Sequence, residues 1–133
     1  MARVLVVDDD HTLAEVTRRT LERAGHAVEL AENGRNAIES YQNRTFDIVL
    51  TDLYMPVMDG MEMLLRIRSE FPDARFVVMS GGGHRPKHDV LADAQRVGAV
   101  GVLPKPFKLD EIVRAVEAAL EHGGTEPSPA PPA

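Results

Sequence analysis

The side chains of this sequence that are best suited to chemistry each follow a short apolar run. Asp8 and Asp9 come after the first run, Asp52 after another, and Ser80 and Lys105 after the last two. Clustered carboxylates repel one another, and without a counter-ion the pKa of at least one of them would rise. A hard divalent cation such as Mg²⁺ relieves that repulsion, because it takes oxygen ligands from carboxylates, water and phosphoryl groups. If these side chains meet, the set suits transfer of a phosphoryl group to a carboxylate.

Within such a set, Asp52 is the natural nucleophile, because the loop that follows it carries turn residues that leave it accessible. A metal ion and the Lys105 ammonium would neutralise the charge on the phosphoryl oxygens, so little other covalent assistance is needed. Asp9 and Asp8 are then expected as metal ligands, Asp8 either directly or through a water molecule. Ser80 would add a hydroxyl donor.

Five short apolar runs predict the strands that must bring these side chains together, at 4–7, 28–31, 48–52, 76–80 and 100–103. Five amphipathic segments alternate with them and begin near residues 10, 33, 59, 86 and 109. Strands that alternate with helices through short loops predict a parallel sheet covered on both faces. Because the carboxyl ends of parallel strands lie at one edge, the chemical side chains are expected to converge there.

Local signals at the helix ends add to this prediction. Asp10 is expected to cap the first helix and Gly25 to end it in a left-handed conformation. Asp59 and Glu62 form the pattern of a capping box for the third helix. Lys108 stands where a short polar cap is expected, so the last helix is predicted to start without a strong side-chain cap. At helical spacing the first helix carries Leu13, Val16, Thr20, Leu21 and Ala24, the third Met61, Leu64, Leu65 and Ile67, and the last Leu109, Ile112, Val113, Val116 and Leu120.

Composition indicates a soluble domain in a reducing compartment, and we expect a cytoplasmic location. The 133 residues suit one domain, and the absence of cysteine excludes disulfides and thiolate metal sites. The net charge of -6 argues against nonspecific binding to nucleic acid or anionic membranes, and no apolar run approaches the roughly 20 residues of a membrane span. Residues 1–122 are expected to form the domain, and the proline-rich segment 123–133 to be a disordered tail or a linker stub.

Four motifs in this order carry a family resemblance: VLVVDDD at 4–10, DIVLTDLYMPVMDG at 47–60, VVMSG at 77–81 and LPKPF at 103–107. Over residues 3 to about 122 the chain resembles the receiver domains of two-component response regulators. The resemblance implies an α/β fold of the flavodoxin-like type, a doubly wound five-stranded parallel sheet of order 2-1-3-4-5 with five helices.

The resemblance also implies a reaction and its residues. Mg²⁺ would be held by Asp8, Asp9, Asp52 and the backbone carbonyl of Tyr54. Asp52 would accept a phosphoryl group from a phosphohistidine on a sensor histidine kinase or a histidine phosphotransfer protein, Ser80 would turn toward it, and Lys105 would bind it. The protein would be a phosphoacceptor switch rather than an enzyme with an external substrate. Its fourth helix, fifth strand and fifth helix would then control a partner protein or a missing output domain.

Three positions of the sequence affect how closely it follows the family pattern. Val102 occupies the place where many receivers carry a Tyr or Phe switch, and valine is too stiff at χ1 to swing as a ring does. Tyr54, two residues after Asp52, is bulky enough to limit water access to an acyl phosphate, which predicts slow self-hydrolysis. The Lys105–Pro106 bond resembles the cis peptide of the family.

Other functions use part of the same pattern. A Mg²⁺-dependent phosphohydrolase with an aspartyl-phosphate intermediate would need a specificity cap, for which 133 residues leave no insertion. A flavodoxin-like or nucleotide-binding module would place glycines after the first strand, where three aspartates instead repel a pyrophosphate. A pseudo-receiver scaffold is disfavoured because every acid, the hydroxyl and the lysine are present. The sequence also has no basic DNA-binding segment or helix-turn-helix pattern, so direct contact with nucleic acid is not expected.

Overall fold

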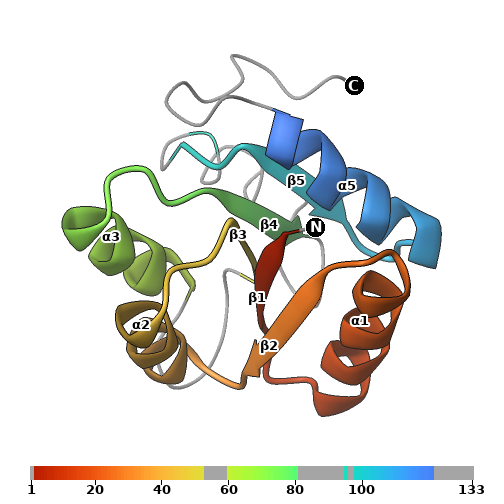
Figure 1. Ribbon diagram of the computed structural model, residues 1–133, viewed down its shortest axis with the longest axis horizontal. Helices are drawn as coiled ribbons and strands as arrows, with labels where there is room; N and C mark the ends of the chain where they lie inside the picture. The colour runs from red at the N-terminus through yellow and green to blue at the C-terminus, as the bar shows by residue number, and fades with distance from the viewer. Residues whose placement is uncertain (1, 53–59, 81–94, 96–97, 122–133) are drawn as a thin grey trace.

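Five parallel strands form the centre of the molecule (Figure 1). The computed structural model describes residues 2–52, 60–80, 95 and 98–121. The strands are β1 (Arg3–Val7), β2 (Ala27–Ala31), β3 (Ile48–Asp52), β4 (Phe76–Ser80) and β5 (Gly101–Pro104). Neighbouring strands pair in parallel in the order β2-β1-β3-β4-β5. The predicted sheet, its strand order and its fold class are thereby confirmed.

The three central strands, β1, β3 and β4, are built mainly of apolar residues because both faces of the sheet are covered. Alternate residues of β1 point to opposite sides, so Leu5 joins one apolar cluster and Val4 the other. The first cluster includes residues of helices α2 (Gly34–Asn43) and α3 (Gly60–Glu70). The second includes residues of α1 (His11–Arg23) and α5 (Leu109–Glu121). Figure 1 shows α2 and α3 on one side of the sheet and α1 and α5 on the other.

The described residues contain four of the five predicted helices. The helix predicted from about residue 86 to residue 97 falls outside the described ranges, apart from Gln95, which is helical. Asp59, the first member of the predicted capping box, also lies outside them. Among the described residues, no helix has both the length and the apolar character that crossing a membrane requires.

The two predicted signals at the ends of α1 are confirmed, whereas the prediction for the start of α5 is not. Asp10 Oδ1 accepts a hydrogen bond of 3.1 Å from the Leu13 amide, and Gly25 has a φ of +98° after the end of α1. The prediction of a weakly capped last helix is corrected, because Glu111 Oε1 accepts a 2.7 Å hydrogen bond from the Lys108 amide. The cap comes from the third residue of the helix rather than from the residue that precedes it.

The face of α1 that is buried differs from the face that the sequence predicted. Val16 is exposed, whereas Ala14, Thr17 and Leu21 are buried. The Thr17 hydroxyl donates a 2.8 Å hydrogen bond to the Leu13 carbonyl, which satisfies the hydroxyl and allows the side chain to be buried. Leu65 in α3 and Leu109 in α5 are likewise exposed.

Candidate functional site

The candidate site lies at the carboxyl edge of the sheet, where the strand register brings distant residues together. Val7 is opposite Thr51, so Asp8 and Asp52 leave β1 and β3 at neighbouring positions. Ser80 is opposite Pro104, so Lys105 begins the chain just beyond β5. Each predicted site residue whose backbone the structure describes is therefore at this edge.

The central contact of the site is an ion pair between Asp52 and Lys105. Lys105 Nζ lies 3.0 Å from Asp52 Oδ2. The lysine side chain spans the end of β4, which lies between β3 and β5 in the sheet. The two side chains are only 19% and 20% exposed, so solvent screens their attraction less than it would screen a surface pair. A lysine cation thus contacts the carboxylate predicted to be the nucleophile.

Asp8 is the most buried acid of the site, with 3% of its surface exposed. Its Oδ1 accepts a 2.9 Å hydrogen bond from the Asp10 amide. Burial raises the pKa of the Asp8 carboxyl above its ordinary value; the Asp10 amide and Lys105 oppose this, while Asp52 and Asp9 add to it. The protein alone therefore stabilises the ionised form of Asp8 poorly.

The second oxygen of Asp8 tests whether the site suits Mg²⁺. Asp8 Oδ2 is buried and has no hydrogen-bond partner among the described residues. A cation, or water bound to a cation, would satisfy this oxygen and offset the repulsion from Asp52 and Asp9. Within the described part of the chain, no three His, Cys, Asp or Glu side chains stand together closely enough to hold a metal ion. The donors present fit Mg²⁺ because this ion commonly uses one or two carboxylates and keeps several water molecules.

The remaining predicted residues are only partly covered by the structure. Ser80 ends β4, but its side chain lies outside the described part, as does the whole of Tyr54. The Lys105–Pro106 peptide bond is cis, as predicted. Val102 is partly buried and packs against the apolar cluster on the α2 and α3 side of the sheet.

The sequence interpretation missed a second group of polar residues beside Asp8. His11 Nε2 lies 3.4 Å from Glu32 Oε2, and both residues line a hollow of about 310 Å³ together with Asp8 and Asn36. Glu32 directly follows β2, so its position after a strand was a signal of the same kind as that of Asp52. The signal is weaker there because β2 is an edge strand in which Ala31 is buried but the other apolar residues are only partly buried.

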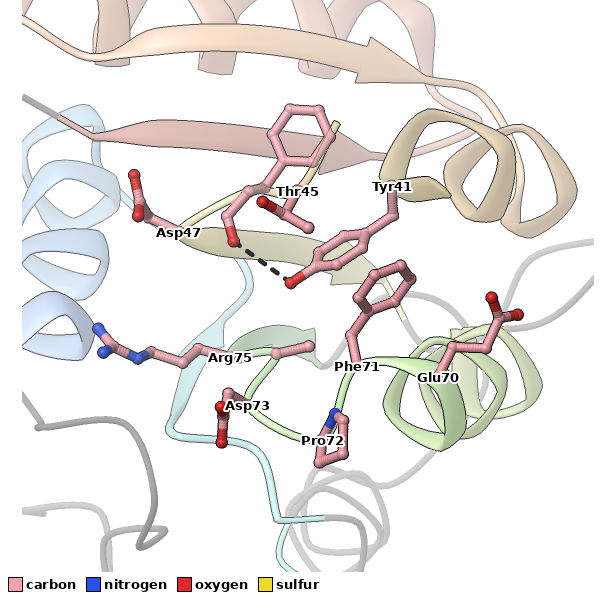
Figure 2. A pocket seen from close by; sticks show the side chains of 10 residues that line it. Tyr41, Thr45, Asp47, Glu70, Phe71, Pro72, Asp73 and Arg75 are labelled. Atoms are coloured by element: carbon pink, nitrogen blue, oxygen red, sulfur yellow. Dashed lines mark hydrogen bonds between the residues drawn. The ribbon is translucent and has the colours of Figure 1, made fainter. Parts of the chain in front are cut away.

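A larger hollow, of about 380 Å³, lies at the opposite edge of the sheet (Figure 2). Its residues come from the ends of α2 and α3 and from the segments that lead into β3 and β4. The Tyr41 hydroxyl donates a 3.3 Å hydrogen bond to the Phe46 carbonyl across it. Figure 2 shows the carboxylates of Asp47, Glu70 and Asp73 pointing in different directions. These acids do not converge on one point, unlike the groups at the carboxyl edge.

Comparison with known proteins gives a consistent result. The family model described as "Response regulator receiver domain" matches residues 4–117. The DNA-binding transcriptional regulator NtrC of Escherichia coli strain K12 is 37% identical over 119 residues, which are 90% of this chain and 25% of that protein. Response regulator MprA of Mycobacterium sp. strain KMS is 36% identical over 131 residues, 98% of this chain and 56% of that protein. The chain thus spans between a quarter and about half of these relatives.

Solved structures resemble the whole described fold. Chemotaxis response regulator CheY4 of Vibrio cholerae aligns with a TM-score of 0.79 and 31% identity, covering 90% of this chain and 98% of that one. The receiver domain of NtrX from Brucella abortus aligns with a TM-score of 0.82 and 29% identity, covering 90% and 99%. Receiver domains are signalling switches and do not turn over an external substrate. From the family match, the shared fold and the acids and lysine at one sheet edge, the chain belongs to the receiver domains of two-component response regulators.

Proposed function

We propose that this receiver accepts a phosphoryl group on Asp52, from a phosphohistidine of a sensor histidine kinase or a histidine phosphotransfer protein, in a Mg²⁺-dependent reaction. The observation that supports this most directly is the 3.0 Å contact between Asp52 and Lys105 at the carboxyl edge of the sheet. Family membership supports the same role. The proposed receiver domain is residues 1–122, followed by a tail or linker at 123–133.

The proposed reaction requires little covalent assistance from the protein. A carboxylate oxygen of Asp52 attacks the phosphorus, the P–N bond to the donor imidazole breaks, and the imidazole takes up a proton. The Lys105 ammonium moves from the carboxylate to a phosphoryl oxygen, where it neutralises negative charge. Mg²⁺, held by Asp8, Asp9, Asp52 and the carbonyl of Tyr54, would supply further neutralisation. The hydroxyl of Ser80 would donate a hydrogen bond to the phosphoryl group.

The phosphorylated state would be transmitted through the predicted fourth helix, β5 and α5 to a partner or an output domain. Lys105 lies between β5 and α5, so a displacement of its ammonium acts directly on both elements. Val102 is partly buried against an apolar cluster, and its β-branched side chain is restricted at χ1, which makes rotation of this side chain a poor signal. We therefore assign the transmission to Lys105 and to the segment that follows Ser80.

Incubation with Mg²⁺ and acetyl phosphate, followed by intact mass spectrometry, tests the proposal. The wild-type chain should gain one phosphoryl group in Mg²⁺ and none in EDTA, and Asp52→Asn should gain none. Asp73→Asn is a matched control, because Asp73 is an exposed aspartate at the other edge of the sheet. No gain in the wild-type chain, or a gain that persists in Asp52→Asn, would show the proposed acceptor to be wrong.

The same preparation measures the lifetime of the product. Tyr54 is expected to shield the acyl phosphate from water, so decay in Tyr54→Ala should be faster than in the wild-type chain. Equal decay rates in the two proteins would show that Tyr54 does not shield the acyl phosphate.

A further inference from the structure

The hollow beside Asp8 contains polar groups that the proposed phosphoryl transfer does not use. It lies between the ends of β1 and β2 and the first turns of α1 and α2. Besides Asp8, its polar lining consists of His11, Glu32 and Asn36. Its volume of about 310 Å³ is several times the roughly 30 Å³ that one water molecule occupies in the liquid. The hollow can therefore hold a group of water molecules in contact with Asp8.

Two observations connect this hollow with the proposed cation site. Asp8 lines the hollow, and its buried Oδ2 has no hydrogen-bond partner within the described ranges. Glu32 places a second carboxylate on the same hollow, and His11 Nε2 lies 3.4 Å from it. Both members of the His11–Glu32 pair are exposed, so the Glu32 carboxylate remains hydrated.

We propose that Glu32 raises the affinity of the site for Mg²⁺ by accepting hydrogen bonds from water molecules bound to the ion. This inference rests on the proposed Mg²⁺-dependent function. Glu32 is exposed and its carboxylate remains hydrated, so it is expected to act through bound water rather than by direct coordination. Mg²⁺ dehydrates reluctantly, and groups that contact its bound water contribute to its affinity. Glu32 is therefore a positioning residue and does not contact the phosphoryl group.

Isothermal titration calorimetry with MgCl₂ alone tests the inference without a phosphodonor. Glu32→Gln should weaken Mg²⁺ binding by about 10-fold, the lower end of the range for such outer contacts, because Glu32 is exposed. Glu29→Gln is the matched control, since it removes the same charge from an exposed position of β2, the strand that Glu32 follows. The control separates the local effect from a general change in net charge.

The Mg²⁺ dependence of phosphorylation gives a second readout. In Glu32→Gln, the Mg²⁺ concentration for half-maximal rate should rise, while the rate at saturating Mg²⁺ should equal that of the wild-type chain. Equal Mg²⁺ affinities in Glu32→Gln and Glu29→Gln would overturn the inference and leave the proposed function intact. Absence of Mg²⁺ binding in the wild-type chain would overturn both.

Discussion

Lys105 Nζ and Asp52 Oδ2 lie 3.0 Å apart although the two residues are separated by 53 positions in the sequence. Three parallel strands produce this contact, because β4 lies between the strands that end at Asp52 and Pro104. The pair is about four-fifths buried, so replacing one member leaves the other partly desolvated. The order of the strands thus brings a cation and a carboxylate together at the edge of the sheet.

The first prediction concerns this lysine. Lys105→Met should reduce the rate at which Asp52 is phosphorylated by acetyl phosphate by roughly 100-fold, the usual effect of removing one group that stabilises developing charge. Lys108→Met is the control, because Lys108 is exposed and follows Lys105 closely. Initial rates at saturating Mg²⁺ from intact mass spectrometry measure the effect. A rate within twofold of the wild-type value in Lys105→Met would contradict the prediction.

The second prediction concerns the buried charge of Asp8. In EDTA at pH 7, Asp8→Asn should raise the free energy of unfolding by about 0.5–2 kcal/mol, because it removes a poorly stabilised carboxylate. Asn retains the oxygen that accepts from the Asp10 amide. Urea denaturation measures the difference. Mg²⁺ should stabilise the wild-type chain more than Asp8→Asn and so reduce the gap.

The pH dependence of this difference has a definite sign. The pKa of Asp8 is raised in the folded protein, chiefly by burial, so the folded state binds this proton more tightly than the unfolded state. The contribution to stability is fully present below the ordinary value of 3.8 and is lost as the pH rises through the higher folded pKa. The stabilities of the wild-type chain and Asp8→Asn should therefore separate toward neutral pH. A constant difference from acid to neutral pH would rule out this explanation.

The sequence predicted the sheet and the meeting of Asp52 with Lys105 because both follow from strand order and from the direction of parallel strands. It did not predict the His11–Glu32 pair, since that contact depends on how the first turn of α1 approaches the segment that follows β2. It also misplaced the inward face of α1. The Thr17 hydroxyl donates a hydrogen bond to a main-chain carbonyl of the same helix, so this side chain can be buried as an apolar residue would be.

The start of α5 gives the third prediction. Glu111 Oε1 accepts from the Lys108 amide at 2.7 Å, and the Glu111 amide donates to the Lys108 carbonyl at 3.0 Å. Glu111→Ala should lower the free energy of unfolding by about 0.5–1 kcal/mol, as the loss of a helix cap does. Glu111→Gln should retain most of this stability because a glutamine oxygen accepts the same hydrogen bond. Equal urea midpoints for Glu111→Ala and Glu111→Gln would contradict the assignment of a cap.

The last prediction compares two glycines with positive φ. Gly25 has a φ of +98° and open space where a Cβ would stand, whereas a Cβ on Gly98, with a φ of +74°, would lie 2.9 Å from Arg68 Nη1. Arg68 Nη2 donates to the carbonyls of Ala74 and Gly98, and burial lowers the pKa of this guanidinium. Gly25→Ala should cost about 1–2 kcal/mol of backbone strain.

Gly98→Ala should cost more than Gly25→Ala, because the added methyl group also displaces the Arg68 guanidinium from its carbonyl acceptors. The excess should be about 1.5–3 kcal/mol, the usual contribution of a hydrogen bond to a charged group. In an Arg68→Met background the displaced group is absent, so the two alanine substitutions should have nearly equal effects on urea stability. An excess cost of Gly98→Ala that persists in that background would place its cause in the backbone rather than in the contact with Arg68.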